Sequence, residues 1–371
     1  MSGVEFQEAR LGNGLTVIGE RNPAARSVAV GYFVRTGSRD ETPDVAGVSH
    51  FLEHMLFKGS ETLSAWDINR LLDELGARSN AFTSEEVTAY HGAVLPERQA
   101  GLLGLLTRMM RPALREDDFE VERQVILEEI EMYADQPASL AFEALREAYF
   151  AGHPLGHSVL GTAETVGALE REKMLAYFER RYAPDNLTLA LAGAYDWDAA
   201  LEAAGRLTAG WAPAGAGRDH PPFEPGSGVR TLEHARFNRA HLAAMAPGHA
   251  SADPLHYAAG VLAVALGDAE GSRLYWSLVH GGLCETASLD HGAEDGLGAF
   301  SAYAVTDPAR AQEALDRLRE TLLAAQAEGL RPDELERAKR KVAVSQVLRA
   351  ETPYGRLFPL ALEYLDARRH V

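Results

Sequence analysis

Residues 47–59 read GVSHFLEHMLFKG, and they are the starting point for interpreting this chain. Their apolar spacing predicts a helix over residues 45–57 that stops at Gly59. On a helix, His50 and His54 lie one turn apart on the same face, so both imidazoles can reach one metal ion. Glu53 is close to that face and can act as a general base on water, in the inverse of the commoner H-E-x-x-H order. The pattern is typical of a zinc-dependent hydrolase.

A catalytic zinc ion generally takes three protein ligands and leaves a fourth position for water, so one more ligand is needed. Cys284 is the only cysteine, and any metal must therefore be held by histidines and carboxylates. A helix predicted over residues 116–134 offers four candidates: Glu122, Glu128, Glu129 and Glu131. Glu122 and Glu129 are seven residues apart, which puts them two turns apart on one face.

The composition narrows the class of protein. The chain has 371 residues, a length that predicts two domains. Of these residues 46% are hydrophobic and 24% charged, and no apolar run is long enough for a membrane span, so we expect a soluble globular protein. Its formal net charge of −18 repels phosphate backbones and anionic lipids, which disfavours nucleic-acid and membrane partners. The first eight residues (MSGVEFQE) lack the features of a secretory signal, so a cytoplasmic location is expected.

Residues 212–228 (APAGAGRDHPPFEPGSG) are the best candidate for a linker, because they are crowded with Gly and Pro and show no apolar period. They divide the chain into a first domain, residues 1–211, and a second domain, residues 229–371. Strands mixed with helical pairs predict an α+β fold. The second half begins with a similar order of elements, so we expect two similar domains, the second one shortened and truncated at Val371.

Apolar periodicity and capping signals place the individual elements. In the first half, strands are predicted over residues 15–19, 27–35, 77–83, 87–95 and 187–191. Helices are predicted over residues 97–110, 116–134 and 164–182. A further helix is predicted to begin at a capping box formed by Ser64 and Asp67 and to end at Gly76. In the second half, strand-like segments lie near Val229, His241, Ala287 and Phe300, and helices over residues 255–266, 308–327 and 332–349.

Three motifs in the first half, in this order, resemble the pitrilysin, insulin-degrading enzyme and mitochondrial processing peptidase family. They are residues 47–59, the segment NAFTS at residues 80–84 with Glu86, Thr88 and Tyr90 behind it, and the pair Glu122-Arg123 that precedes Glu129. The resemblance is greatest to the short two-domain bacterial branch. It implies two similar domains, each with a mostly antiparallel sheet packed with helices.

The resemblance also implies a role for individual residues. The zinc ligands are then His50, His54 and Glu129, with Glu53 as the base and Glu122 supporting the site. The segment Asn80, Ala81, Phe82 and Thr83 is similar to the family's substrate-binding edge strand, to which an extended peptide adds by main-chain hydrogen bonds.

The second half departs from the family pattern. Members that complete their own active site carry an Arg and a Tyr seven residues apart, and here those positions fall on Leu278 and Glu285. Arg273 and Tyr275 are nearby but only two residues apart, so a structural role is expected for them. The resemblance therefore implies the catalytic subunit of a heterodimer, whose zinc-free homologous partner supplies the missing contacts, or else a homodimer.

The predicted function is a zinc-dependent endopeptidase that hydrolyses peptides or unfolded segments bound as an extended strand. The alternative is a non-catalytic subunit in which zinc stabilises a peptide-binding or assembly module. Glu53 favours the peptidase, because a structural zinc site needs no base and is usually closed by four ligands. Mn or Co would fit the same ligands as zinc.

Overall fold

The computed structural model describes residues 3–367, so the predicted end at Val371 lies outside the described residues. The chain forms two compact units. The first consists of the residues up to 131, residues 157–219 and the residues from 349 onward, and the second of residues 132–156 and 220–348. Each unit contains one sheet packed with helices, which confirms the expected α+β fold. The domain and linker limits inferred from the sequence stay a prediction.

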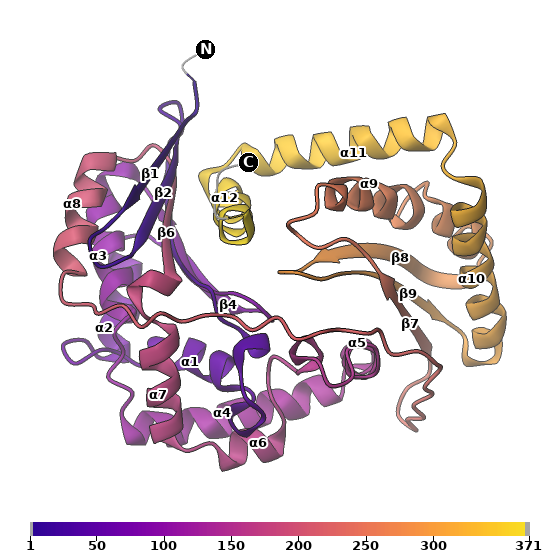
Figure 1. Cartoon of the computed structure of the whole chain (residues 1–371), viewed down its shortest axis with the longest axis horizontal. Coiled ribbons are helices and arrows are strands. Elements are labelled where there is room, and N and C mark those ends of the chain that lie inside the picture. Colours follow the sequence, from indigo (N-terminus) through magenta and orange to yellow (C-terminus); the bar gives the residue numbers. More distant parts are fainter. Residues whose placement is uncertain (1–2, 368–371) are drawn as a thin grey trace. The chain divides into compact units, whose positions relative to one another are not determined.

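The first unit is built on a six-stranded sheet (Figure 1). From one edge to the other the strands are β1 (Glu5–Arg10), β2 (Thr16–Arg21), β6 (Leu187–Gly193), β3 (Val28–Val34), β5 (Thr88–Val94) and β4 (Arg78–Thr83). All neighbours are antiparallel except β2 and β6, which are parallel. The sheet is mostly antiparallel, as expected, and β4 forms one of its edges.

Both faces of this sheet are covered, because alternate side chains of its central strands enter different cores. The even-numbered residues of β3 from Val28 to Val34 belong to one core, whereas Ala29 and Phe33 belong to the other. The helices that contribute to the first core are α1 (Val48–Leu56), α2 (Ala65–Glu74), α3 (Gln99–Met109), α4 (Glu116–Ala134), α6 (Ala163–Ala168), α7 (Arg171–Arg181) and α8 (Trp197–Leu207).

The second face is covered by α12 (Pro353–Ala367), a helix that the sequence reading did not include. Leu357, Leu360 and Leu365 of this helix are buried against the sheet. Gly31 permits the close approach, because a Cβ atom there would lie 3.3 Å from Leu357 Cδ2 and 3.0 Å from the Cβ atom of His91.

The single helix predicted over residues 164–182 is wrong, because two helices occupy this region. α6 (Ala163–Ala168) ends before Leu169, whose backbone is extended, and α7 begins at Arg171. The guanidinium of Arg123 on α4 donates hydrogen bonds to the carbonyls of Val166, Gly167 and Leu169. These bonds give partners to carbonyl groups at the end of α6, so the helix can stop there.

The second unit has a smaller, three-stranded antiparallel sheet in the order β7 (Ala240–Pro247), β9 (Gly298–Thr306), β8 (Cys284–Ala293). Its helices are α5 (Pro137–Tyr149), α9 (Leu255–Gly267), α10 (Ala311–Glu328) and most of α11 (Pro332–Ala350). The predicted strand near Val229 is wrong: residues 212–239 form neither helix nor strand, and the Val229 side chain is exposed. No helix among residues 3–367 is both long and apolar enough to cross a membrane.

Candidate metal centre and active site

Helix α1 carries both histidines, and its first turn is anchored by a buried carboxylate. Gly47 precedes the helix with a φ of +95°, a conformation that favours glycine. The backbone N–H groups of Gly47 and Ser49 each donate a hydrogen bond of 2.7 Å to Glu41. Burial raises the pKa of Glu41 to about 7, and the two backbone hydrogen bonds oppose this rise by favouring the ionised carboxylate. The entry of the chain into α1 is thereby fixed.

Helix α4 presents one carboxylate-bearing face to α1. Phe119, Glu122, Ile126 and Glu129 follow one another at intervals of three and four residues, which places them on one side of the helix. The ring of Phe119 stacks on that of Phe51 in α1, with centroids 4.7 Å apart and planes 2° from parallel. Because this packing fixes the two helices against each other, the carboxylates of α4 lie beside the histidines of α1.

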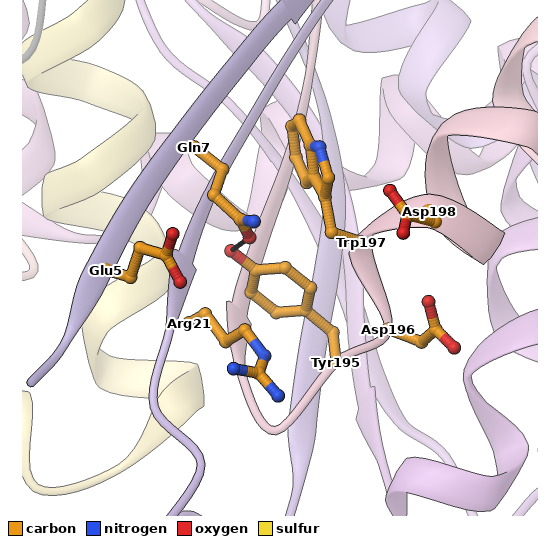
Figure 2. Close-up of a pocket in the computed structure, with 7 residues that line it drawn as sticks. All are labelled: Glu5, Gln7, Arg21, Tyr195, Asp196, Trp197 and Asp198. Atoms are coloured by element: carbon orange, nitrogen blue, oxygen red, sulfur yellow. Dashed lines mark hydrogen bonds between the residues drawn. The ribbon is translucent and has the colours of Figure 1, made fainter. Parts of the chain in front are cut away.

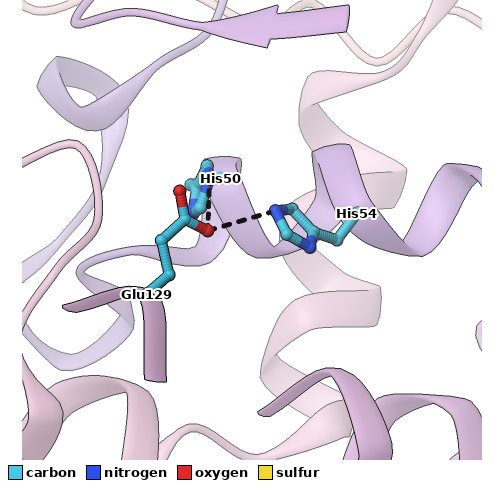
Figure 3. Close-up of side chains that lie close together, drawn as sticks. All are labelled: His50, His54 and Glu129. Atoms are coloured by element: carbon cyan, nitrogen blue, oxygen red, sulfur yellow. Dashed lines mark ion pairs between the residues drawn. The ribbon is translucent and has the colours of Figure 1, made fainter. Parts of the chain in front are cut away.

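His50, His54 and Glu129 form a compact group of possible metal ligands (Figure 3). The Oε2 atom of Glu129 lies 3.7 Å from His50 Nε2 and 3.6 Å from His54 Nε2. Ligand bonds of about 2.0–2.1 Å in a tetrahedral site put neighbouring donor atoms about 3.4 Å apart, so the two oxygen-to-nitrogen distances are close to those that zinc requires. All three donor atoms lie within 4.8 Å of one another. No other such group of three occurs among the residues that the structure describes, and Glu128 and Glu131 are exposed outside it.

His50 is prepared to act as a neutral ligand. Burial, with a smaller effect of the His54 charge, lowers the pKa of His50 to about 4. At neutral pH one of its ring nitrogens therefore carries a lone pair that can bind a cation, and Nε2 is the nitrogen nearer Glu129. The buried Nδ1 atom has no hydrogen-bond partner among the described atoms. Packing orients the ring instead, since it lies edge-on to His54 with centroids 4.7 Å apart.

His54 is oriented by a carboxylate behind it. Its Nδ1 atom lies 2.9 Å from Glu122 Oε2, so an Nδ1–H group that donates to this oxygen leaves the Nε2 lone pair facing Glu129. The other oxygen of Glu122 forms an ion pair with Lys58. The sequence reading missed Lys58, although its position four residues after His54 was an available signal.

Glu53 lies beside this group and is bound to the edge strand. It is partly buried, and its Oε2 atom accepts a hydrogen bond of 2.6 Å from the hydroxyl of Thr83. Burial raises the pKa of Glu53, whereas the Thr83 hydrogen bond and the charge of His54 lower it, and the charge of Glu129 raises it again. Two of the three candidate ligands, His54 and Glu129, thus act on the charge of Glu53.

The predicted substrate strand is β4, at the edge of the sheet. Its side chains alternate: Ala81 belongs to the core beneath α1, and Phe82 packs on the opposite face against Phe358 of α12. Asn80 shares the face of Phe82, so within this segment the side chain that reaches Glu53 is that of Thr83. The outer main-chain edge of β4 pairs with no other named strand of the sheet.

In the second unit, Leu278 and Glu285 occupy the positions at which a substrate-binding Arg and Tyr would be expected. Leu278 is fully buried in the core of this unit, and Glu285 forms an ion pair with Arg239. Arg273 forms two hydrogen bonds, of 2.9 and 2.7 Å, with the carboxylate of Glu334. Its interaction within the unit fits the structural role expected for it.

A separate hollow of about 360 Å³ lies in the first unit at the starts of β1 and α8 (Figure 2). Its lining consists of Glu5, Gln7, Arg21, Tyr195, Asp196, Trp197 and Asp198. The hydroxyl of Tyr195 donates a hydrogen bond of 3.1 Å to Gln7. None of the candidate ligands, nor Glu53, lines this hollow, so it is distinct from the metal centre.

Comparison with known protein families gives two matches that together span most of the chain. Residues 16–163 match the profile of the insulinase family, peptidase family M16. Residues 168–342 match the profile of the peptidase M16 inactive domain. The first match contains all the candidate metal ligands.

Individual proteins are similar over nearly the whole length. An "uncharacterized zinc protease", YmxG of Bacillus subtilis, is 32% identical over 356 residues, which cover 93% of this chain and 84% of that protein. Among solved structures, a protease from Helicobacter pylori has a TM-score of 0.91 at 21% identity, with 98% of this chain and 90% of that chain covered. A chain of complex III2 from Candida albicans has a TM-score of 0.81 at 20% identity, with 100% and 87% covered.

Proposed function

The chain belongs to peptidase family M16, the insulinase family, and from this membership we propose that it is a zinc-dependent endopeptidase acting on extended peptides. The observation that carries the proposal is the grouping of His50, His54 and Glu129, with Glu53 on the same helix as the two histidines. A hydrolase of this type needs three ligands, a base and access for the substrate.

In this proposal, His50 and His54 bind zinc through Nε2 and Glu129 binds it through a carboxylate oxygen. When bound, zinc lowers the pKa of a water molecule and polarises the scissile carbonyl group. Glu122 keeps the proton of His54 on Nδ1, because it accepts the hydrogen bond from that atom. Lys58 forms an ion pair with the other oxygen of Glu122 and so helps to hold this carboxylate behind the histidine.

Glu53 performs the proton transfers. It takes a proton from the attacking water and later delivers it to the nitrogen of the leaving amine. Its partly buried position supports this role, because burial raises the pKa of the carboxylate towards the range in which a group can both accept and donate a proton.

The substrate class follows from the edge strand. An extended peptide can add to the outer edge of β4 through main-chain hydrogen bonds, with little demand on its sequence. Folded domains present few such segments, so we propose short peptides and unfolded segments as substrates. Asn80 to Thr83 would form the main-chain contacts nearest the metal centre.

We further propose that the active species is a dimer, with a homologous zinc-free chain as the preferred partner and a second copy as the alternative. Leu278 and Glu285 support this proposal, because neither can replace the guanidinium or phenol that would contact the substrate. A cytoplasmic location remains a prediction. Assay of the chain alone and mixed with a homologous zinc-free subunit tests the heterodimer, and full activity of the chain alone would exclude it.

A non-catalytic peptide-binding or assembly subunit is the second candidate. The same replacement of the Arg and Tyr favours it, whereas Glu53 argues against it, since a purely structural metal site gains nothing from a base. The two candidates differ in the effect of changing Glu53 while zinc binding is kept. A peptidase would then lose peptide hydrolysis, whereas a non-catalytic subunit has no hydrolysis to lose.

The deciding experiment compares the wild-type protein with Glu53→Gln on a library of quenched fluorescent peptides, with zinc content measured in the same samples. We expect the wild type to hydrolyse peptides and Glu53→Gln to bind equal zinc with a rate lowered about 10²–10⁴-fold, as for loss of a general base. Zinc-loaded wild type that cleaves no peptide, alone or with its partner, would favour the non-catalytic candidate.

A further inference from the structure

The hydroxyl of Thr83 is the only hydrogen-bond partner of the Glu53 side chain among the residues that the structure describes. We propose that Thr83 is a positioning residue that holds the base in the orientation needed for proton transfer. This inference rests on the proposed peptidase function and adds to it a side-chain role that main-chain binding of the substrate does not require.

The geometry leaves one oxygen of the base free. The Thr83 hydroxyl donates to Glu53 Oε2 at 2.6 Å, a short bond of the kind formed between a hydroxyl group and an ionised carboxylate. Oε1 then remains available for the proton of the attacking water. Without this bond, a glutamate side chain can rotate about three bonds, and the productive orientation becomes one of several.

Thr83 is itself held firmly. Its β-branched side chain restricts rotation about the Cα–Cβ bond. The turn that follows is closed by a hydrogen bond of 2.8 Å from the Ser84 backbone N–H to the Val87 carbonyl, and the Arg39 N–H donates to the Glu85 carbonyl at 2.9 Å. Arg39 also forms an ion pair with the carboxylate of Glu86. The end of β4 is therefore a rigid support for the base.

Arg218 adds a further fixed point to the same turn. It lies in the segment predicted as the linker, yet its side chain is buried in the first unit. It donates to the Glu86 carbonyl at 2.7 Å and to the carboxylate of Asp40 at 3.0 and 2.8 Å. The hydroxyl that orients Glu53 thus belongs to the strand on which the substrate is proposed to lie, so substrate docking and base orientation share one element.

The test uses three variants of the full chain. Thr83→Val keeps the shape of the side chain and removes the hydroxyl, Thr83→Ser keeps the hydroxyl, and Thr188→Val makes the same change at a buried threonine of β6. With zinc content equal, we expect Thr83→Val to lower kcat about tenfold or more with KM within about twofold, and Thr83→Ser to restore most of kcat. Thr188→Val should keep the wild-type kcat.

Unchanged kcat in Thr83→Val, or a rise in KM alone, would overturn the inference. Crystal structures of the zinc-loaded wild type and variants give a readout that does not depend on activity. We expect the Glu53 carboxylate to keep its orientation in the wild type and Thr83→Ser and to rotate in Thr83→Val. If the Glu53 carboxylate does not move in Thr83→Val, the positioning role is refuted, even if the protein cleaves no peptide. If the carboxylate rotates but the wild-type protein is inactive, the positioning role stands and the peptidase proposal is refuted.

Discussion

Each histidine of the metal centre is controlled by a different physical effect. His50 is kept neutral by burial, which lowers its pKa to about 4. His54 is more exposed, and a hydrogen bond to Glu122 fixes which of its nitrogens carries the proton. Two residues of the same type, one helical turn apart, therefore have different surroundings.

This difference gives a prediction for Glu122. In Glu122→Gln the charged acceptor behind His54 is lost and Lys58 keeps no carboxylate partner, so we expect zinc affinity to fall about 10–100-fold. Competition with a chromophoric chelator measures the affinity. Glu128→Gln removes an exposed carboxylate from the same helix and should leave the affinity unchanged. Equal weakening in both variants would show that the helix charge, and not the hydrogen bond to His54, is responsible.

The sequence could name candidate site residues, because the motif is local. His50, Glu53 and His54 lie within one helix, whereas Glu129 was selected among the carboxylates of a second helix through the family resemblance. The link between Thr83 and Glu53 could not be predicted, because it joins residues 30 positions apart through the packing of α1 against β4. The assignment of these residues as ligands and base stays a prediction until metal and activity are measured.

Among the elements, α12 shows most clearly what periodicity cannot reveal. The central strands β3 and β6 are buried along their whole length, so each needs a cover on both faces. α12 supplies the second cover from a position far along the chain, and Pro359 within it weakens any helical signal. Elements with local signals were placed closely: the Ser64–Asp67 capping box does begin α2, and α4 has the predicted limits of 116 and 134.

Leu357 tests the contribution of α12 to stability. Its side chain is fully buried between α12 and the sheet, so we expect Leu357→Ala to lower the free energy of unfolding of the first unit by about 3 kcal/mol, from lost burial and a residual cavity. Denaturant unfolding followed by circular dichroism measures this loss. Leu323→Ala, at a leucine of α10 that is 51% exposed, should cost less than about 0.5 kcal/mol. Similar losses in both variants would contradict the covering role of α12.

At the scale of the whole molecule, two compact units with separate cores need not unfold together. The second unit depends on a buried ion pair between Arg273 and Glu334, with Glu334 also accepting a hydrogen bond from the Arg331 backbone N–H. The Arg273 hydrogen bonds, aided by that of Arg331, lower the pKa of Glu334 from 4.5 to about 2 despite its burial. The two units should therefore respond differently to acid.

The depressed pKa sets the direction of this response. A carboxylate whose folded pKa is lowered stabilises the fold above its unfolded value of 4.5, and this contribution is lost as the pH falls from about 4.5 to about 2. We expect about 2–3 kcal/mol to be lost from the second unit over this range. Urea unfolding at pH 6 and pH 3 measures it. Glu334→Gln should be less stable at pH 6 and should lack this part of the pH dependence; an unchanged dependence would contradict the assignment.

The position of α12 also matters while the protein is being made. The six strands of the first sheet leave the ribosome long before Leu357 is translated, because residues 220–348 of the second unit lie between β6 and α12 in the chain. At about 5–20 residues per second this interval is on the order of 10 s. For that time the nascent sheet has one apolar face without its cover, a surface that chaperones bind. The first unit is therefore complete only after residues 220–348 of the second unit have been synthesised, so incomplete chains are expected to be recognised as unfolded.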